Sequence, residues 1–406
     1  MAQVDKFLNF LIKNAGSDLH LVTGSPPIVR IDGLLQKMNL PPLTADQVKS
    51  LIYEIVPERN RKEYEAINDT DFAYEIPKVA RFRTNIYRDI RGPGMAQRLI
   101  PFDIMTVDDL GLPQLIRDLV MLPKGILLCT GPTGCGKSTT LAALLEYANQ
   151  RRADHVVTIE DPIEFVHENI KCIFSHRQVG LHTESFRRAL RASFREDPDV
   201  VLVGEMRDLE TTALAITAAE TGHLVLATVH TTTASSTVDR VIDQFPPDRQ
   251  SQIRVMLAAT LKAVITQALC RRKVKGRVAA FEILVVHSAV QNLIREKKTF
   301  QLPSVIQTGK KYGMITMNES LMNLVHDGFI DLGEAYSKSI DKQDMNDRVN
   351  QYLLSLVAAG QVTPLDAMKQ SYFRPKMLEL LVANGFGKAL KSLDLSKLDL
   401  AEEVVT

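Results

Sequence analysis

The stretch Gly131-Pro132-Thr133-Gly134-Cys135-Gly136-Lys137-Ser138 decides the fold of this chain. It matches the phosphate-binding loop pattern G-x-x-x-x-G-K-[S/T] at every position. An apolar run at Gly125–Thr130 precedes it, and a helical pattern at Ser138–Asn149 follows it. Glycines in such a loop expose backbone N–H groups at a helix N-terminus, where these groups can surround a phosphate. The sequence therefore predicts a nucleoside triphosphate site between a buried strand and a helix.

The loop supplies both a positive charge and a metal ligand. Lys137 is expected to reach the β- and γ-phosphate oxygens, and Ser138 is expected to hold Mg²⁺. The other residues expected to contact the nucleotide are Gly131, Pro132, Thr133, Gly134, Cys135, Gly136 and Thr139. The alternative is a glycine-rich turn in an unrelated fold, which the strand and helix patterns on both sides disfavour.

A second apolar run, Val200–Val203, leads into Gly204 and Glu205. A strand parallel to the first one would deliver the Glu205 carboxylate beside the Mg²⁺. There Glu205 is expected to polarise the attacking water as a general base, and to act on the metal either directly or through water. An Asp usually precedes the Glu of this motif, so Gly204 leaves direct ligation open. The alternative for Glu205 is a surface cap at a strand end.

Chemistry-bearing side chains also stand at the ends of two further apolar runs. They are Glu160 and Glu164 after residues 156–159, and His223 and His230 around residues 224–228. The two carboxylates are catalytic candidates, and His230 is expected to donate to the γ-phosphate. His223 is a candidate nucleotide contact. A satisfied core or cap residue is the alternative for each of these side chains.

The composition is that of a globular multidomain chain. It has 406 residues, 49 basic and 48 acidic, and a formal net charge of +1. This length predicts two domains and an appendage. Basic and acidic residues nearly balance, so the chain lacks the excess of positive charge that non-specific nucleic-acid binding requires. The most apolar runs are far shorter than the ~20 residues that span a bilayer, so no membrane span is expected.

The first residues and the cysteines indicate a cytoplasmic protein. Met1–Lys13 has the pattern of an amphipathic helix, without the continuous apolar region of a secretory signal. Cys129, Cys135, Cys172 and Cys270 form no C-x-x-C pair. We therefore expect free thiols in a reducing compartment and no zinc site.

Residues 1–100 predict a small α+β domain with a mainly antiparallel sheet. Thr44 and Gln47 have the spacing of a capping box, which predicts a helix that ends at Ile55 before a proline. Gly92-Pro93-Gly94 is expected to break the chain between two strands. The expected strands cover residues 18–22, 28–31, 71–75, 80–88 and 95–100.

The rest of the chain follows a different pattern. Apolar runs alternate with longer helical stretches over residues 101–287, as a buried parallel sheet requires. Residues 288–343 are expected to be mostly helical and to belong to the same domain. Residues 344–406 are expected to form a helical tail, for which the sequence suggests no role.

Four segments taken together resemble the motifs of the type II/type IV secretion ATPases. They are Gly131–Thr140 (Walker A), Thr158–Glu164 (Asp box), Leu202–Asp208 (Walker B) and Glu220–Thr233 (His box). In that family a Gly is normal before the Walker B Glu, as Gly204 is here. Further segments are similar to the family's N-terminal domain: Ser17–Leu21, Pro26-Pro27, Arg30–Gly33 and Arg81–Asn85. The resemblance covers roughly residues 1–345. It implies an α/β fold in which a small PAS-like α+β domain precedes a RecA-like P-loop ATPase domain with a helical C-terminal extension.

Within the family, the chain most resembles the pilus retraction (twitching motility) branch. Pilus-assembly and secretion members carry a further N-terminal domain and a four-cysteine zinc module. This sequence begins directly at the PAS-like domain, and the corresponding stretch contains only Cys270. Ala289–Thr299 is similar to a helix motif of the retraction branch, from which Val290, Gln291 and Lys297 depart. An accessory retraction ATPase of the same family is the alternative.

The resemblance also implies that arginines complete the site. Hydrolysis needs positive charge at the γ-phosphate beyond that of Mg²⁺ and the loop lysine. The matching positions in the N-terminal domain are Arg83 and Arg98, and Arg277 is a weaker candidate for a nucleotide contact. A solvated strand arginine is the alternative for Arg83 and for Arg98.

The function implied by the resemblance is that of an ATP-hydrolysing, Mg²⁺-dependent homohexameric motor without zinc. It would power type IV pilus retraction from the cytoplasmic face of the inner membrane. Its partners there would be the inner-membrane pilus platform protein and other pilus machinery. Other hypotheses are a pilus-assembly or secretion ATPase, a non-hydrolysing regulator, which the complete set of motifs disfavours, and a nucleic-acid translocase. A translocase would need a basic channel with stacking aromatic residues, yet the chain has no Trp.

Overall fold

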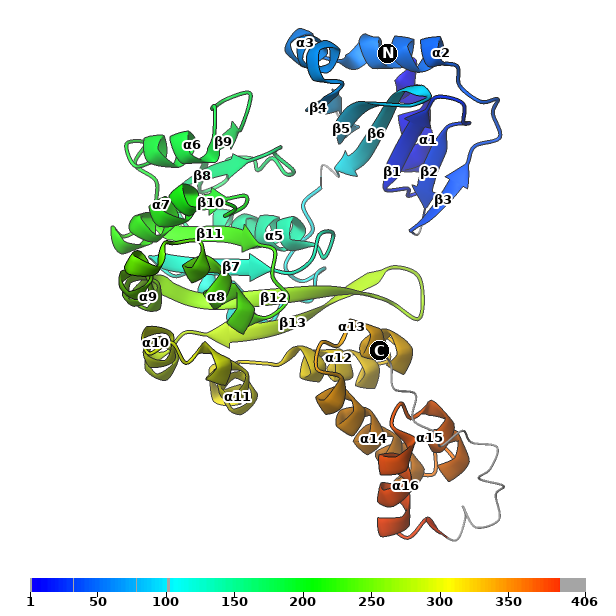
Figure 1. Ribbon diagram of the computed structural model, residues 1–406, viewed down its shortest axis with the longest axis vertical. Coiled ribbons are helices and arrows are strands. Elements are labelled where there is room, and N and C mark those ends of the chain that lie inside the picture. The colour runs from blue at the N-terminus through cyan, green and yellow to red at the C-terminus, as the bar shows by residue number, and fades with distance from the viewer. Residues whose placement is uncertain (1, 32, 78, 101–102, 388–406) are drawn as a thin grey trace.

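The computed structural model describes residues 2–31, 33–77, 79–100 and 103–387. Figure 1 shows three successive parts: a sheet with its helices, a larger sheet with helices on both faces, and a run of helices toward the C-terminus. This arrangement confirms the predicted α/β fold. Met1 of the expected first helix and residues 388–406 of the expected tail lie outside the described residues.

The first part is an antiparallel six-stranded sheet with the strand order β3-β2-β1-β6-β5-β4. Its helices pack apolar side chains such as Leu8 and Ile52 against Phe82 and Ile86 of the sheet. The strands are β1 (Asp18–Val22), β2 (Ile28–Ile31), β3 (Leu34–Lys37), β4 (Asp69–Ile76), β5 (Ala80–Asp89) and β6 (Gly92–Ile100), and the helices are α1 (Val4–Lys13), α2 (Ala45–Ile55) and α3 (Glu58–Ile67).

The first part differs from the sequence prediction at several points. The capping box of Thr44 and Gln47 is confirmed, and α2 has the predicted bounds. The expected break at Gly92-Pro93-Gly94 is wrong, because these residues begin β6 and pair with Arg88 and its neighbours in β5. Pro93 is tolerated at the start of the strand, and a side chain at Gly94 would collide with Tyr87. Helix α3 and strand β3 were not predicted.

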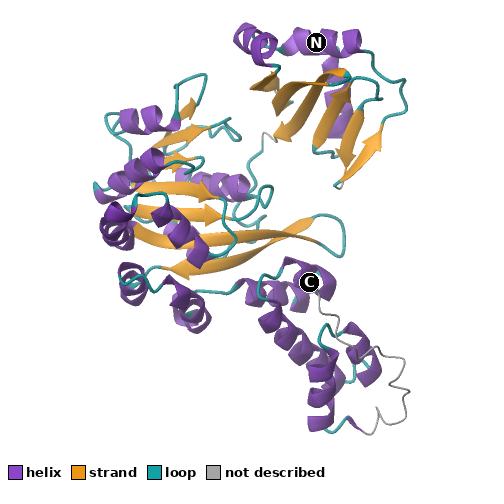
Figure 2. Ribbon diagram, in the orientation of Figure 1, coloured by secondary structure: helices purple, strands orange, loops and turns teal. Residues whose placement is uncertain are grey.

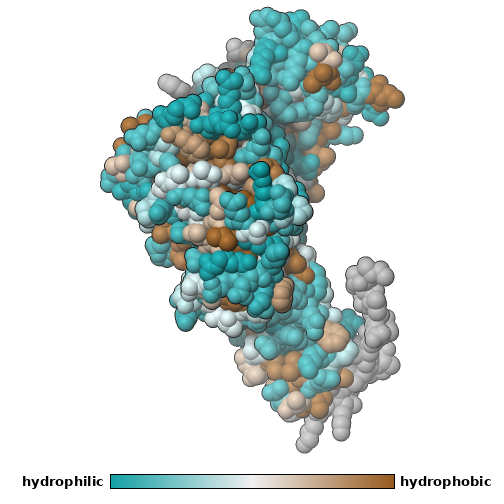
Figure 3. Space-filling model, turned by 60° about the vertical axis from the view of Figure 1, so that its left-hand side comes forward, coloured by the Kyte–Doolittle hydropathy of each residue, from teal (hydrophilic) through white to brown (hydrophobic). Residues whose placement is uncertain are grey.

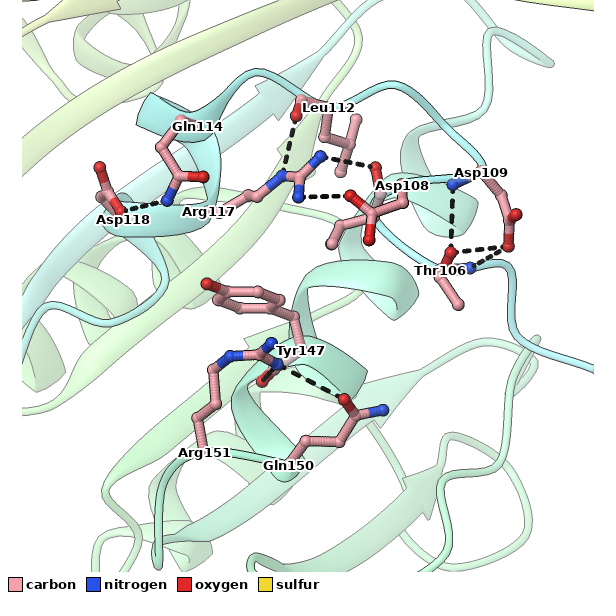
Figure 4. Close-up of polar contacts among 11 residues, drawn as sticks. Thr106, Asp108, Asp109, Leu112, Gln114, Arg117, Asp118, Tyr147, Gln150 and Arg151 are labelled. Carbon is pink, nitrogen blue, oxygen red and sulfur yellow. Dashed lines mark hydrogen bonds and ion pairs between the residues drawn. The ribbon is translucent and has the colours of Figure 1, made fainter.

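The segment that follows the first sheet is fixed by short polar contacts (Figure 4). Thr106 and Asp109 bond each other through side chain and backbone. The Arg117 guanidinium donates to the Asp108 carboxylate at 2.6 Å and to the Leu112 carbonyl at 2.9 Å. These contacts anchor the connecting chain against α4 (Gln114–Leu119), on the second part of the molecule.

The second part is built on a seven-stranded sheet with the order β13-β12-β7-β11-β10-β8-β9. All neighbouring strands are parallel except β12 and β13, which form an antiparallel hairpin. The strands are β7 (Gly125–Thr130), β8 (His155–Glu160), β9 (Ile173–Gln178), β10 (Val200–Val203), β11 (Leu224–Val229), β12 (Leu261–Arg271) and β13 (Arg277–Val285). Four of these strands match predicted apolar runs, whereas β9, β12 and β13 were not predicted.

Helices cover both faces of this sheet (Figure 2). Side chains alternate between the two faces along β7: Ile126 and Leu128 join one apolar cluster, and Leu127 and Cys129 join another. The first cluster lies under α6 (Phe186–Ser193), α7 (Leu209–Glu220), α8 (Ala234–Asp243), α9 (Pro247–Thr260), α10 (Ser288–Arg295) and α11 (Leu302–Thr308), and the second under α4 and α5 (Lys137–Asn149). Burial on both faces explains the continuous apolar runs in the sequence.

The topology gathers the polar segments at one edge of the sheet. The phosphate loop follows β7, and the other motif segments follow β8, β10 and β11. Because these four strands are parallel neighbours, their carboxyl ends meet at the same edge. Ligand sites of open α/β sheets lie at this edge.

The third part is a bundle of helices that shares a core with the β12–β13 hairpin. Cys270 and Ala280 of the hairpin pack in one apolar cluster with Leu321, Leu353 and Met377. The segments are η1 (Thr299–Gln301), η2 (Lys310–Tyr312), α12 (Met317–His326), α13 (Leu332–Lys338), α14 (Lys342–Ala358), α15 (Pro364–Gln370) and α16 (Arg374–Ala383). The described portion of the tail therefore continues the core of the preceding helices.

The face of the molecule in Figure 3 is mainly hydrophilic, with scattered apolar residues. Across the described ranges, no helix has the length and hydrophobicity to cross a membrane.

Candidate active site

The phosphate loop is shaped by glycines. Gly131, Gly134 and Gly136 have φ angles of 140°, 79° and 92°, which favour glycine over other residues. A β-carbon at Gly131 would lie 2.4 Å from the Gln267 carbonyl oxygen, so the loop also needs glycine for space. Gly136 precedes α5 and leaves the first helical N–H groups facing the loop. This is the geometry of an anion site at a helix N-terminus.

The Lys137 ammonium lies inside the loop. Its Nζ donates to the carbonyl oxygens of Gly131 at 2.8 Å and Pro132 at 3.1 Å, and the side chain is buried. A buried ammonium needs such acceptors because burial removes its hydration. Phosphate oxygens are stronger acceptors for a cation than neutral carbonyls. The lysine is thus held beside the place where a phosphate would enter.

Gln267 of β12 supports the loop from the neighbouring strand and was missed in the sequence. Its Nε2 donates to the Cys135 carbonyl at 2.7 Å, and its Oε1 accepts from the Thr140 hydroxyl at 2.8 Å. Gln267 is buried, so both bonds are shielded from water. It therefore connects the loop to the first turns of α5. Without β12 among the predicted strands, no signal singled it out.

Glu205 contacts Arg207 and His230 just beyond β10. Arg207 Nη2 lies 2.6 Å and His230 Nε2 lies 3.4 Å from Glu205 Oε2. Partial burial favours the protonated carboxyl, but the hydrogen bonds and charges of Arg207 and His230 outweigh it and hold the Glu205 pKa below its usual value. The structure thus brings together two predicted residues, Glu205 and His230, and adds Arg207, which the sequence analysis had not singled out.

Glu160 has the opposite electrostatic environment. Burial raises the pKa of Glu160 to about 7, although hydrogen bonds from the Thr158 hydroxyl and the Glu164 N–H favour its charged form. The Glu164 N–H lies 3.3 Å from Glu160 Oε2. One carboxyl group with a raised pKa and one with a lowered pKa, at neighbouring strand ends, is a pattern typical of catalytic sites.

A small pocket lies at these strand ends. Ser138, Glu160, Gly204 and Thr228 all line it. They come from the ends of β8, β10 and β11 and from the start of α5. Mg²⁺ in nucleotide sites takes one or two protein oxygens together with phosphates and waters. The hydroxyl of Ser138 with a nearby carboxylate fits that donor set.

Four predicted residues lie away from this pocket. His223 precedes β11, at the opposite end of the strand from His230, and its ring bonds the Ala218 carbonyl at 2.8 Å. Arg277 begins β13 at the tip of the hairpin, opposite Arg271. The two remaining arginines are register neighbours in the first sheet and bond acidic side chains there: Arg83 to Asp71 at 3.9 Å, and Arg98 to Asp18 at 2.8 Å.

A different arginine of the first sheet lies nearer the pocket. The charge of Arg81 opposes the rise in the pKa of Glu160 that burial causes, and it adds to the fall in the pKa of His176 in β9 that burial causes. Its side chain is mostly buried and pairs with Glu75 at 3.4 Å. Within the described ranges, no group of three or more His, Cys, Asp or Glu residues is placed to hold a metal ion. All four cysteines are free thiols.

A phosphate loop at the carboxyl edge of a parallel sheet, with acidic and histidine side chains at the adjacent strand ends, defines a P-loop ATPase. The sequence model of the type II/IV secretion system protein family matches residues 1–337. The chain belongs to this family. As a member of it, the chain is an ATPase that uses a nucleotide.

Comparison with individual proteins shows which branch of the family this chain resembles. The type IV pilus retraction ATPase PilT of Pseudomonas aeruginosa is 49% identical over 336 residues, which are 83% of this chain and 98% of that protein. The twitching motility protein of Neisseria gonorrhoeae is 46% identical over 321 residues, 79% of this chain and 86% of that protein. A crystal structure of the pilus retraction motor PilT with bound ADP has a TM-score of 0.78 at 41% identity, covering 86% of this chain and 99% of that one. The predicted resemblance to the retraction ATPases is confirmed.

We predict that Gln267→Ala weakens nucleotide binding about ten-fold, because the loop loses two buried hydrogen bonds that hold it in shape. Titration of the purified chain with a fluorescent ATP analogue measures this change. Gln114→Ala is the matched control, since Gln114 is an exposed residue of α4 whose side chain bonds the nearby Asp118 carboxylate. An unchanged dissociation constant for Gln267→Ala would contradict the supporting role.

Proposed function

We propose that this chain is the ATP-driven motor of type IV pilus retraction. The observation that carries the proposal is that Lys137, Ser138, Glu160 and Glu205 stand at or just beyond the carboxyl ends of parallel strands of one sheet. The chain is also 49% identical to a pilus retraction ATPase over nearly that protein's whole length. The shared length includes the antiparallel first sheet as well as the ATPase sheet. Both parts that a motor of this kind needs are therefore present.

The geometry supports a simple division of labour for hydrolysis. The N–H groups of the glycine loop bind the phosphates, and Lys137 exchanges its carbonyl acceptors for phosphate oxygens. Ser138, and Glu205 directly or through water, would hold Mg²⁺, which would supply positive charge to the phosphates. Glu205 orients and deprotonates the attacking water, for which its lowered pKa keeps it ionised. His230 lies beside Glu205 and is positioned to donate to the γ-phosphate.

Mechanical work requires the first sheet to respond to the nucleotide. Arg83 and Arg98 are exposed and bond acidic residues of their own sheet. We assign them the role of completing the positive charge at the γ-phosphate when the two parts close on ATP. Closure on binding and opening on product release convert chemistry into rigid-body motion. In the proposed assembly six copies form a ring that docks on the inner-membrane pilus platform from the cytoplasmic side.

We predict that Lys137→Ala abolishes ATP hydrolysis and that Glu205→Gln lowers kcat at least about 100-fold while nucleotide binding is largely kept. The lysine contributes to phosphate binding, whereas the carboxylate acts on water. Phosphate release assays and analogue titrations separate the two effects. Glu379→Gln, which changes an exposed carboxylate of α16, is the control that keeps wild-type turnover. Wild-type turnover in Glu205→Gln would refute its role as the base.

The cellular function is tested in a strain that lacks this protein. Loss of a retraction motor leaves assembly running, so we expect hyperpiliated cells that do not twitch. Counting surface pili by electron microscopy and measuring twitching zones gives the result. Cells without pili would instead indicate an assembly ATPase, and piliated cells that still twitch would indicate an accessory ATPase. The Lys137→Ala chain should fail to restore twitching.

A further inference from the structure

A hydrogen-bonded chain of side chains leads away from Glu160 into the edge of the sheet. Thr158 and Glu160 are two residues apart on β8, so their side chains lie on the same face. His176 is the register partner of Thr158 on the parallel edge strand β9. Thr158 Oγ1 and His176 Nδ1 are 2.9 Å apart. On the other side of the ring, the His167 backbone N lies 3.2 Å from His176 Nε2.

These contacts determine where the protons of the chain reside. A backbone N–H can only donate, so His176 Nε2 accepts and carries no proton. The ring is neutral, because burial and then the charge of His167 lower the pKa of His176 to about 4. A neutral ring without a proton on Nε2 carries it on Nδ1. The Nδ1–H therefore donates to the Thr158 oxygen, and the Thr158 hydroxyl is left to donate its own proton to Glu160.

The surroundings hold the ring in this orientation. His176 stacks with Phe174 at a centroid distance of 5.6 Å and with His167 at 6.0 Å. His167 is itself fixed by a 2.9 Å contact from its Nδ1 to the Glu146 carboxylate of α5. Thr158 is buried. The charged and titratable groups that act on the His176 ring are thus His167, from the segment between β8 and β9, and Arg81 of β5.

We propose that His176 is a positioning residue for hydrolysis, which donates from Nδ1 to Thr158 and thereby commits the Thr158 hydroxyl to Glu160. In the opposite tautomer the hydrogen bonds would run the other way. The Thr158 hydroxyl would then donate to His176 Nδ1, and Glu160 would lose a donor. With the inferred direction, the Thr158 hydroxyl and the Glu164 N–H both donate to Glu160. They fix the carboxyl group beside Ser138 and Gly204. The expected effect on turnover depends on the proposed ATPase mechanism. The assignment of the His176 tautomer does not depend on it.

Two nearly isosteric substitutions test the role in catalysis. His176→Asn keeps a donor near the position of Nδ1, and His176→Leu removes it. We expect His176→Leu to lower kcat about ten-fold to a hundred-fold, the size of effect that a small misplacement of a catalytic group produces. The KM for ATP should change little, and His176→Asn should recover most of kcat. Equal losses in the two variants, or a loss seen only in KM, would overturn the proposal.

A control histidine, His155, lies on β8, the strand of Thr158 and Glu160, away from the pocket. The His155 ring bonds the Glu196 carbonyl at 2.9 Å and the Ser175 hydroxyl at 2.9 Å, at the opposite end of β8 from Glu160. His155→Leu should keep wild-type kcat. Thermal melting of all three variants shows whether each is folded, so that a loss of activity in a folded chain is assigned to the positioning role.

Nitrogen-15 NMR of histidine-labelled full-length chain reads the tautomer directly. Of the nine histidines, the signal missing in His176→Asn belongs to His176. We expect a neutral ring with its proton on Nδ1 at pH 6 to 8. A proton on Nε2, or a charged ring, would overturn the proposal. Because this measurement needs no hydrolysis, it decides the hydrogen-bond direction even if the wild-type chain does not hydrolyse ATP.

Discussion

The structure depends on the burial of β7 between two layers of helices. All six residues of this strand are buried, and the side chains from Ile126 to Cys129 alternate between two separate apolar clusters. A strand that is buried on both faces lies in the interior of a sheet, among parallel neighbours. The carboxyl ends of these parallel strands then lie at the same edge of the sheet. The phosphate loop leaves β7 at this common edge and meets the ends of β8, β10 and β11 there. The chemistry of the site therefore follows from the way the sheet buries its apolar surface.

Sequence reasoning succeeded where one physical signal dominated. Continuous apolar runs gave β7 and β10 their observed bounds, because burial on both faces leaves no polar positions in the pattern. It failed for β9 and β12. Only the last residue of β9 is buried, so this edge strand lacks an apolar run. In β12, buried polar residues such as Gln267 interrupt the run, and their partners lie more than 100 residues away in the chain.

The residues of the candidate site likewise fall into those that the sequence predicts and those that it does not. The loop and Glu205 are local patterns, which a sequence can display. The contact of Thr158 with His176 depends on the register between β8 and β9, which pairs residues 18 positions apart and which a single sequence does not reveal. Arg81 differs from Arg83 in what it faces, although both belong to the same segment of β5. The two residues are two positions apart and so lie on the same face of β5, and only the surroundings of that sheet separate their roles.

The central claim is that the Lys137 ammonium donates to carbonyl groups of its own loop without nucleotide and donates to phosphate oxygens when ATP binds. A structure of the chain with Mg²⁺ and a non-hydrolysable ATP analogue tests it most directly. The account predicts phosphates inside the loop from Gly131 to Ser138, with the Lys137 ammonium moved from the Gly131 and Pro132 carbonyls to phosphate oxygens and Glu205 facing the γ-phosphate. An analogue bound elsewhere, or a Lys137 that keeps its carbonyl contacts beside bound phosphates, would contradict it.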